Sequence, residues 1–306
     1  MRWNVAAWAV CAAFALIAAF TLTDYGINWD EGLQREYGRR ALRYYTSGFQ
    51  DQSHAAFRDL RFYGPAFEMA AAALARVAPA REWDLRHALV ALCALGAIVA
   101  TMRIALLVAG PRAAFLASLF LVLTPHFYGN AFSNSKDIPF AAAFAGTVWA
   151  GMRLISTRRW PFAFACGTLL GILLAIRIGG VFLAGLLAAA LAASWMADAS
   201  RIRGDLQRFA VVIAIAWLVM VALWPWAHAA PLAHPLEALR VAMAFPDIHA
   251  TLFEGSIVFS HEMPRRYVPK MFAITTPLPI LVLTAVGVVV LVREAFRDRE
   301  RRAAIV

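Results

Sequence analysis

The residues best suited to chemistry lie in a polar segment, residues 23–60, that follows a first apolar segment. It contains two adjacent carboxylates, Asp30 and Glu31. A carboxylate at a membrane surface could deprotonate an acceptor hydroxyl or amine as a general base, or help to hold a divalent cation. Because adjacent side chains point in different directions, we expect only one of the two to face a substrate. The alternative is that these acids cap a helix or pair with Arg35 or Arg39.

A second candidate is the run Asn134-Ser135-Lys136-Asp137-Ile138-Pro139-Phe140. Asp137 stands where an apolar segment begins, and the helix dipole alone would favour an acid there. Lys136 is one of two lysines in the chain. A cation beside a carboxylate at a helix start could hold a phosphate while Asp137 contacts a sugar or a metal. Both interpretations remain open from these residues.

Arg177 lies between two apolar segments and is followed after one residue by Gly179-Gly180. An arginine at the centre of a bilayer costs about 2.5–3.5 kcal/mol on insertion scales, so an intramembrane arginine suggests a function. It could bind a lipid phosphate, since the glycines allow the backbone to come close. The alternative is an arginine that extends from a short turn to the membrane surface.

A third polar segment, residues 227–269, contains Glu254, Arg265 and Arg266. The arginines could contact headgroup phosphates, or could be ordinary interfacial anchors. The histidines of this segment lack the spacing of metal ligands, so we expect no structural metal there. In the first segment, Tyr63 and Glu68 could shape the edge of a pocket, or could only begin a surface helix.

Composition indicates a membrane protein. Of the 306 residues, 62% are hydrophobic and 16% are charged, against about 25% charged in soluble domains. The net charge of +10 is better explained by basic turns between apolar segments than by nucleic-acid binding. The three cysteines, Cys11, Cys93 and Cys166, lie inside apolar segments and are expected to be small buried residues without disulfides.

The pattern predicts an all-α, polytopic transmembrane helical bundle that forms one membrane domain over residues 1–306. Each apolar segment is long enough, or nearly so, to cross about 30 Å of hydrocarbon. The segment 62–79, which contains Pro65, Glu68 and Arg76, is predicted to be an interfacial helix. About eight spans are predicted, at residues 3–22, 86–109, 112–128, 138–155, 160–176, 178–196, 209–226 and 271–292.

The distribution of arginines supports the prediction that segment 62–79 does not cross the membrane. If segment 62–79 does not cross the membrane, the arginine-rich turns and the tail after Arg293 all fall on the side of the first residues, as the positive-inside rule requires. Both termini are then cytoplasmic. The polar segments 23–85 and 227–269 form periplasmic loops, and the first of these carries surface helices.

Three motifs in this order resemble a known family. They are Trp29-Asp30-Glu31, the run from Asn134 to Phe140, and Arg177-Ile178-Gly179-Gly180, and Glu254-Gly255 with Met263-Pro264 to Thr276-Pro277-Leu278 adds to them. The chain resembles the C-type polytopic membrane glycosyltransferases, in particular those similar to glycosyltransferase family 39, the protein mannosyltransferases and aminoarabinose transferases. The chain is shorter than many members of that family.

The resemblance implies a polyprenyl-phosphate-linked sugar donor and a lipid, glycan or protein acceptor at the bacterial inner membrane. It implies that Asp30 acts as base or positions the acceptor, that Asp137 is the second-loop acid, and that Arg177 contacts the lipid phosphate. Stabilising the charge that develops on that phosphate would accelerate transfer. It leaves open whether a divalent cation takes part. A non-catalytic subunit that binds or transports polyprenyl-phosphate sugars is the alternative function, and a structural membrane protein is a third.

Overall fold

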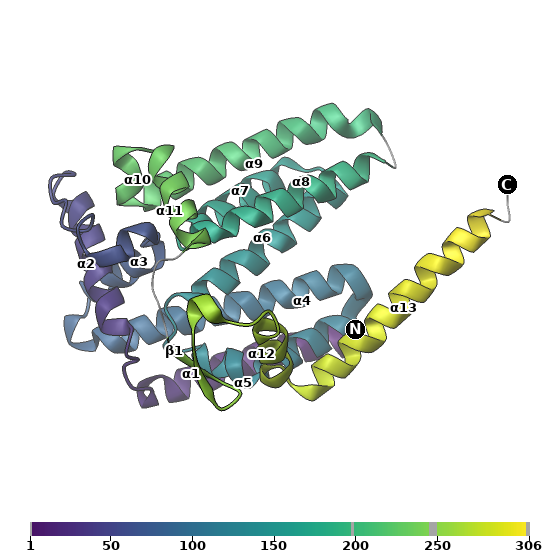
Figure 1. Cartoon of the computed structure of the whole chain (residues 1–306), viewed down its shortest axis with the longest axis horizontal. Helices are drawn as coiled ribbons and strands as arrows, with labels where there is room; N and C mark the ends of the chain where they lie inside the picture. The colour runs from purple at the N-terminus through teal and green to yellow at the C-terminus, as the bar shows by residue number, and fades with distance from the viewer. Residues whose placement is uncertain (1, 197–198, 245–249, 304–306) are drawn as a thin grey trace. The chain divides into compact units, whose positions relative to one another are not determined.

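The computed structural model describes residues 2–196, 199–244 and 250–303, in which helices predominate (Figure 1). The helices are α1 (Arg2–Thr21), α2 (Glu31–Thr46), α3 (Ala66–Ala75), α4 (Glu82–Val122), α5 (Pro125–Asn130), α6 (Asp137–Thr157), α7 (Trp160–Leu174), α8 (Val181–Trp195), α9 (Ile202–Leu223), α10 (Pro225–Ala229), α11 (Ala233–Met243), α12 (Tyr267–Thr275) and α13 (Leu278–Ala303). Short 3₁₀ turns include η1 (Leu22–Asp24), η2 (Arg58–Phe62), η3 (Pro79–Arg81), η4 (Ile178–Gly180), η5 (Ala199–Arg201) and η6 (Ser260–Glu262). Strands β1 (Ala250–Phe253) and β2 (Ser256–Phe259) form an antiparallel hairpin.

The chain forms two compact units. The first comprises Met1–Leu123 and Phe127–Phe245, and the second comprises Thr124–His126 and Pro246–Val306. The first unit contains most of the helices, and the second contains the β-hairpin with α12 and α13. Each unit is described by itself below.

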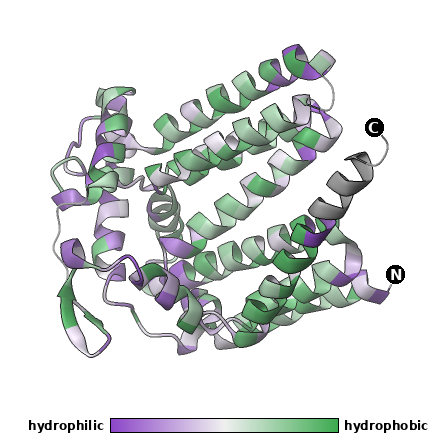
Figure 2. Ribbon diagram, turned by 45° about the vertical axis from the view of Figure 1, so that its right-hand side comes forward, coloured by the Kyte–Doolittle hydropathy of each residue, from purple (hydrophilic) through white to green (hydrophobic). Residues whose placement is uncertain are grey.

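Several helices have the length and apolar character of membrane spans, so the chain is a helical, multi-pass membrane protein. Five segments qualify within the described residues, and a sixth is added if α12 and the first part of α13, which meet at an angle of 115°, count as one broken span. The five are Arg2–Asp24, Pro79–Val122, Asp137–Thr157, Ile178–Trp195 and Ala199–Leu223. Figure 2 shows hydrophobic residues along these helices. The count of about eight spans stays a prediction.

One reason why five or six candidate spans are found in the described chain, and not about eight, is that α4 is counted as one span although it is interrupted at Gly110. That residue has φ 80° and ψ −170°, a conformation open to glycine and costly for other residues. Trp8 of α1 lies beside Arg103, before the break, and Trp3 lies beside Phe115, after it. Two apolar helices therefore meet at Gly110-Pro111, between the predicted spans 86–109 and 112–128. A second reason is α7, whose 15 residues are fewer than the roughly 20 that a straight span needs.

Two apolar cores hold the first unit together. One is formed by α6 to α11 around the buried residues Leu170, Leu173 and Trp224, and the other is formed mainly by α1 and α4 around Phe14, Ile98 and nearby residues. Helix α6 joins them, because Ile138 at its start packs in the second core and its later residues pack in the first. The start of α6, which carries Asp137, is therefore fixed between the two cores.

The segment between α1 and α4 is helical, and it is packed rather than detached. Helix α2 is amphipathic and buries Glu31, Gln34, Tyr37, Gly38, Ala41 and Tyr44, which recur every three or four residues and form one face. Helix α3 packs on it so closely that a Cβ on Gly38 would collide with the backbone of Glu68. At ten residues, α3 is too short to cross a bilayer. Its location at an outer membrane surface stays a prediction.

Candidate functional site

The three sequence motifs of the first unit meet at one polar cavity of about 270 Å³. The residues that line it come from the segment before α2, from the segment before α6 and from the turn after α7. Asp30, Lys136, Asp137 and Arg177 are among them, together with Asn28, Trp29, Glu31, Ser133, Asn134 and Ser135. Segments that are more than 100 positions apart in the sequence thus share one small chamber.

Two ion pairs cross this cavity. The Lys136 ammonium lies 2.8 Å from Asp30 Oδ2, and the Arg177 guanidinium lies 2.8 Å from Asp137 Oδ1. The side chains of Asp30 and Lys136 are each 25% exposed, whereas that of Asp137 is 58% exposed. Each acid therefore faces a cation from another segment, and all four groups are open to a ligand. The structure thus brings Asp30, Lys136, Asp137 and Arg177 together at one cavity.

Asn134 shapes the loop that carries Lys136 and Asp137. Its Oδ1 accepts hydrogen bonds from the backbone N–H groups of Lys136 and Asp137, at 3.2 and 2.8 Å, and its Nδ2 donates to Asp137 Oδ2 at 2.9 Å. Asparagine favours such local bonds at turns and helix starts. Asp137 is consequently held at the first turn of α6, where the helix dipole favours its negative charge. Sequence reasoning noted the motif but did not assign this role to Asn134.

Arg177 is held in an extended turn between α7 and η4. Its backbone N–H donates to Leu173 O at 3.0 Å, and its carbonyl accepts from Gly180 N at 3.0 Å. A Cβ on Gly180 would lie 2.7 Å from Leu173 Cγ, so glycine is required for this close packing. The Nε of Arg177 is buried and has no hydrogen-bond partner among the described groups. The guanidinium therefore retains a donor beyond its pair with Asp137.

A second, largely apolar cavity of about 410 Å³ also reaches Arg177. Its other lining residues are mostly aromatic or aliphatic and come from η2, α6, η4, α8 and α11: Phe62, Tyr63, Phe140, Ile178, Gly179, Phe182, Ala238, Val241 and Ala242. Arg177 is the residue that the two cavities have in common. A charged group beside an apolar cavity suits a ligand with an anionic head and a hydrocarbon tail.

Tyr63 and Gly64 attach the first loop to this region. The Lys136 ammonium lies 5.5 Å from the centre of the Tyr63 ring, within the range of a cation–π contact. Burial raises the pKa of the Tyr63 hydroxyl, and the Arg177 charge opposes that rise. A Cβ on Gly64 would collide with the backbone carbonyl of Ala175. Ala66 N, two residues later, donates to the same carbonyl at 3.1 Å. Tyr63 lines the apolar cavity, and its role in substrate binding stays a prediction.

Glu31 and Glu68 are both buried, although Glu31 also lines the polar cavity. Glu31 is 1% exposed; its Oε2 accepts from Asn28 N at 2.7 Å, and its Oε1 lies 3.2 Å from His87 Nε2. Glu68 is 4% exposed and lies 2.6 Å from the Arg86 guanidinium. Catalysis by Glu31 and substrate binding by Glu68 stay predictions, and the burial of both side chains also suits residues that position the two loops.

Arg86 and His87, at adjacent positions of α4, therefore hold the two loops that line the polar cavity. His87 contacts Glu31 of the first loop, and Arg86 contacts Glu68. Glu68 also forms a side-chain hydrogen bond with Ser135, in the loop of Lys136. Burial raises the pKa of the Glu68 carboxyl, against the opposing effects of Arg86 and Ser135. Sequence reasoning missed Arg86 and His87. The available signal was the presence of two ionisable residues near the start of an apolar segment.

The late-loop residues belong to the second unit. Glu254 accepts from the Arg266 guanidinium at 2.8 Å and from the Lys270 ammonium at 2.7 Å, and Arg265 is exposed. This exposed ion-pair cluster lies around the β-hairpin and α12. The expectation that Glu254, Arg265 and Arg266 bind substrate stays a prediction.

Within the described residues, no group of three or more His, Cys, Asp or Glu side chains is placed to hold a metal ion. Three of the described carboxylate residues line the polar cavity: Asp30 and Asp137 are each paired with a basic residue, and Glu31 lies against His87. Comparison of the chain with protein-family models, with curated proteins and with solved structures finds no match. The site is therefore interpreted from its own geometry.

Proposed function

We propose that the protein is a membrane glycosyltransferase that moves a sugar from a polyprenyl-phosphate carrier to a lipid, glycan or protein acceptor on the periplasmic side of a bacterial inner membrane. The observation that supports this most is the position of Arg177, which lines both the polar and the apolar cavity. A polyprenyl phosphate has a matching structure, because it joins an apolar chain to an anionic phosphate. Its chain would occupy the apolar cavity, its phosphate would lie at Arg177, and its sugar would reach the acids of the polar cavity.

Each charged residue of the polar cavity has its own role in the proposed transfer. Asp30 takes the proton from the acceptor hydroxyl, the acceptor oxygen bonds to the anomeric carbon of the sugar, and the bond from that carbon to the phosphate oxygen breaks. The released lipid phosphate carries the additional negative charge. Arg177 stabilises that charge as it develops, and Lys136 orients Asp30 through their 2.8 Å ion pair. Asp137 holds Arg177 and contacts sugar hydroxyls.

The second candidate is a subunit that binds polyprenyl-phosphate sugars without catalysis. The two ion pairs favour it, because the Asp30 and Asp137 carboxylates are already occupied by Lys136 and Arg177. In that case Arg177 would be needed to bind the lipid phosphate, and the Asp30 carboxylate would not be needed. A purely structural protein would depend on neither residue.

The test compares cells that lack the gene with cells that express wild-type protein, Asp30→Asn or Arg177→Ala. Mass spectrometry of glycolipids and envelope glycans reports transfer, and native mass spectrometry of the purified chain reports binding of undecaprenyl phosphate. Asp84→Asn serves as the matched control, because Asp84 pairs with the exposed Arg81 and lines neither cavity.

A transferase predicts that Asp30→Asn abolishes the glycan product and leaves lipid binding nearly intact. A binding subunit predicts that Asp30→Asn is tolerated and that Arg177→Ala removes both binding and function. If cells expressing both variants have the same glycans as wild type, and both bind undecaprenyl phosphate equally well, the proposed use of this cavity is wrong.

A further inference from the structure

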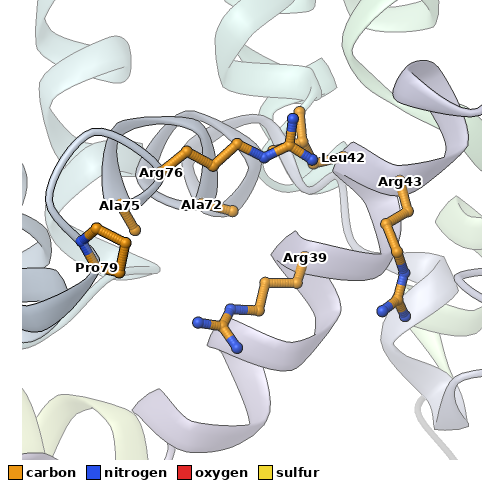
Figure 3. Close-up of a pocket in the computed structure, with 7 residues that line it drawn as sticks. All are labelled: Arg39, Leu42, Arg43, Ala72, Ala75, Arg76 and Pro79. Carbon is orange, nitrogen blue, oxygen red and sulfur yellow. The ribbon is translucent and has the colours of Figure 1, made fainter.

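A separate basic cavity lies between α2 and α3. Its volume is about 280 Å³, and it is lined by Arg39, Leu42, Arg43, Ala72, Ala75, Arg76 and Pro79. Figure 3 shows Arg39 and Arg43 projecting from α2, and Arg76 extending from the end of α3 in the direction of Leu42. None of these residues lines the polar or the apolar cavity of the candidate site. The basic cavity is therefore a different place in the first unit.

The arginines of this cavity are incompletely neutralised by neighbouring acids. Arg39 shares one oxygen of Glu82 with Arg35, at 2.7 and 2.6 Å. Arg43 reaches Asp51 at 3.4 Å and Glu36 at 3.9 Å, and Glu36 is shared with Arg40. Arg76 has no carboxylate partner among the described residues, and its recorded side-chain bond is a 3.5 Å contact with Thr46 Oγ1. Because one acid serves two cations and Arg76 has none, the cavity carries an excess of positive charge.

The remaining surface of the cavity is apolar, and the protein surface beside it is also apolar. Leu42, Ala72, Ala75 and Pro79 complete the lining. Beside Arg76, Val77 is 82% exposed and Leu74 is 37% exposed. A soluble anion needs no hydrocarbon contact, whereas a lipid presents a charged phosphate directly beside its acyl chains. Arginine is the side chain best suited to hold a phosphate, through its paired N–H donors.

We propose that this basic cavity binds the phosphate group of an anionic phospholipid, with Arg76 and Arg43 as the principal contacts. The cavity is at the lower end of the size of small-molecule pockets, so it fits a headgroup and leaves the acyl chains on the apolar surface formed by Leu74 and Val77. This inference does not depend on the proposed glycosyl transfer. It would anchor α2 and α3 to the lipid headgroups, next to the loop that carries Asp30.

The experiment uses the full chain in detergent and measures retained lipid by native mass spectrometry, with phosphatidylglycerol and phosphatidylcholine added separately. Arg76→Gln and Arg43→Gln are compared with wild type. Arg81→Gln is the matched control, because Arg81 lies in η3, which follows α3 and contains the cavity residue Pro79, its side chain is 69% exposed, and it does not line the cavity. Thermal unfolding confirms that each variant is folded.

We expect wild type and Arg81→Gln to retain phosphatidylglycerol in preference to phosphatidylcholine. Each cavity variant should lower the phosphatidylglycerol affinity about fivefold, which corresponds to the loss of about 1 kcal/mol per basic residue near an anionic headgroup. Arg76→Lys should retain most of the binding. Equal retention by wild type and Arg76→Gln, or an equal loss in Arg81→Gln, would overturn the proposal.

Inorganic phosphate distinguishes a lipid site from a site for free phosphate. If the lipid is the ligand, inorganic phosphate at millimolar concentration should leave phosphatidylglycerol bound, because it lacks the contacts of the acyl chains. If inorganic phosphate displaces the lipid from wild type, and its own binding is lost in Arg76→Gln, the phosphate group alone is recognised. The anion site would then stand, and the part of the proposal that requires a lipid would be wrong.

Discussion

The buried ion pair between Glu68 and Arg86 offers the sharpest test of how the polar cavity is supported. The two side chains are 5% and 1% exposed, and a carboxylate oxygen lies 2.6 Å from the guanidinium. Arg86→Met keeps an unbranched side chain and removes its charge, which leaves the Glu68 carboxylate buried without its cation. Because Glu68 joins α3 to the Lys136 loop through Ser135, we expect the whole site to be affected.

The magnitude follows from the burial. Two unit charges about 4 Å apart interact by about 4 kcal/mol at an effective dielectric constant of about 20. Removing one member of a buried pair costs roughly 3–5 kcal/mol. We therefore expect Arg86→Met to lower the free energy of unfolding by about that amount. The double variant Arg86→Met/Glu68→Met should cost less than the single one, because no uncompensated charge remains.

The assay is unfolding in mixed micelles with increasing SDS, followed by circular dichroism, for wild type, both single variants and the double variant. Arg81→Met is the control, because its pair with Asp84 is exposed and such pairs contribute little. If Arg86→Met changes the free energy of unfolding by no more than Arg81→Met does, Glu68 and Arg86 are not a buried pair and the argument for their positioning role fails.

Two further changes test neighbouring parts of the first unit. Gly64→Ala should destabilise the protein by roughly 1–3 kcal/mol, because its new Cβ collides with the Ala175 backbone, whereas Gly179→Ala, which meets no atom within 4 Å, should be nearly neutral in SDS unfolding. Burial lowers the pKa of His54, so the folded protein binds fewer protons than the unfolded one just below pH 6.5, and stability should fall as the pH decreases through that range. His54→Phe should flatten that fall when melting temperatures are compared between pH 7.5 and 5, and an unchanged pH profile would contradict the assignment.

Much of the helical architecture follows from the sequence. Long apolar segments with few charges can satisfy their backbone in a bilayer only as helices, so the all-α class and several spans, including residues 3–22 and 138–155, could be predicted. Gly110-Pro111 could be recognised as a break because the residue pair ends helices. The number of spans was harder to predict, since α7 is too short to decide and hydropathy does not show how α12 and α13 bend.

The roles of individual charged residues were decided by the tertiary structure. The sequence by itself singled out Asp30, Lys136, Asp137 and Arg177 as candidate site residues, and Arg177 stood out because a charge between two apolar segments is costly. Which acid faces the cavity could not be read from Asp30-Glu31, since both side chains have the same chemistry. The contact between Glu31 and His87 of α4 decides it: Glu31 is buried there, and Asp30 is left open to Lys136. The basic cavity likewise exists only because α2 and α3, which are apart in the chain, place their arginines side by side.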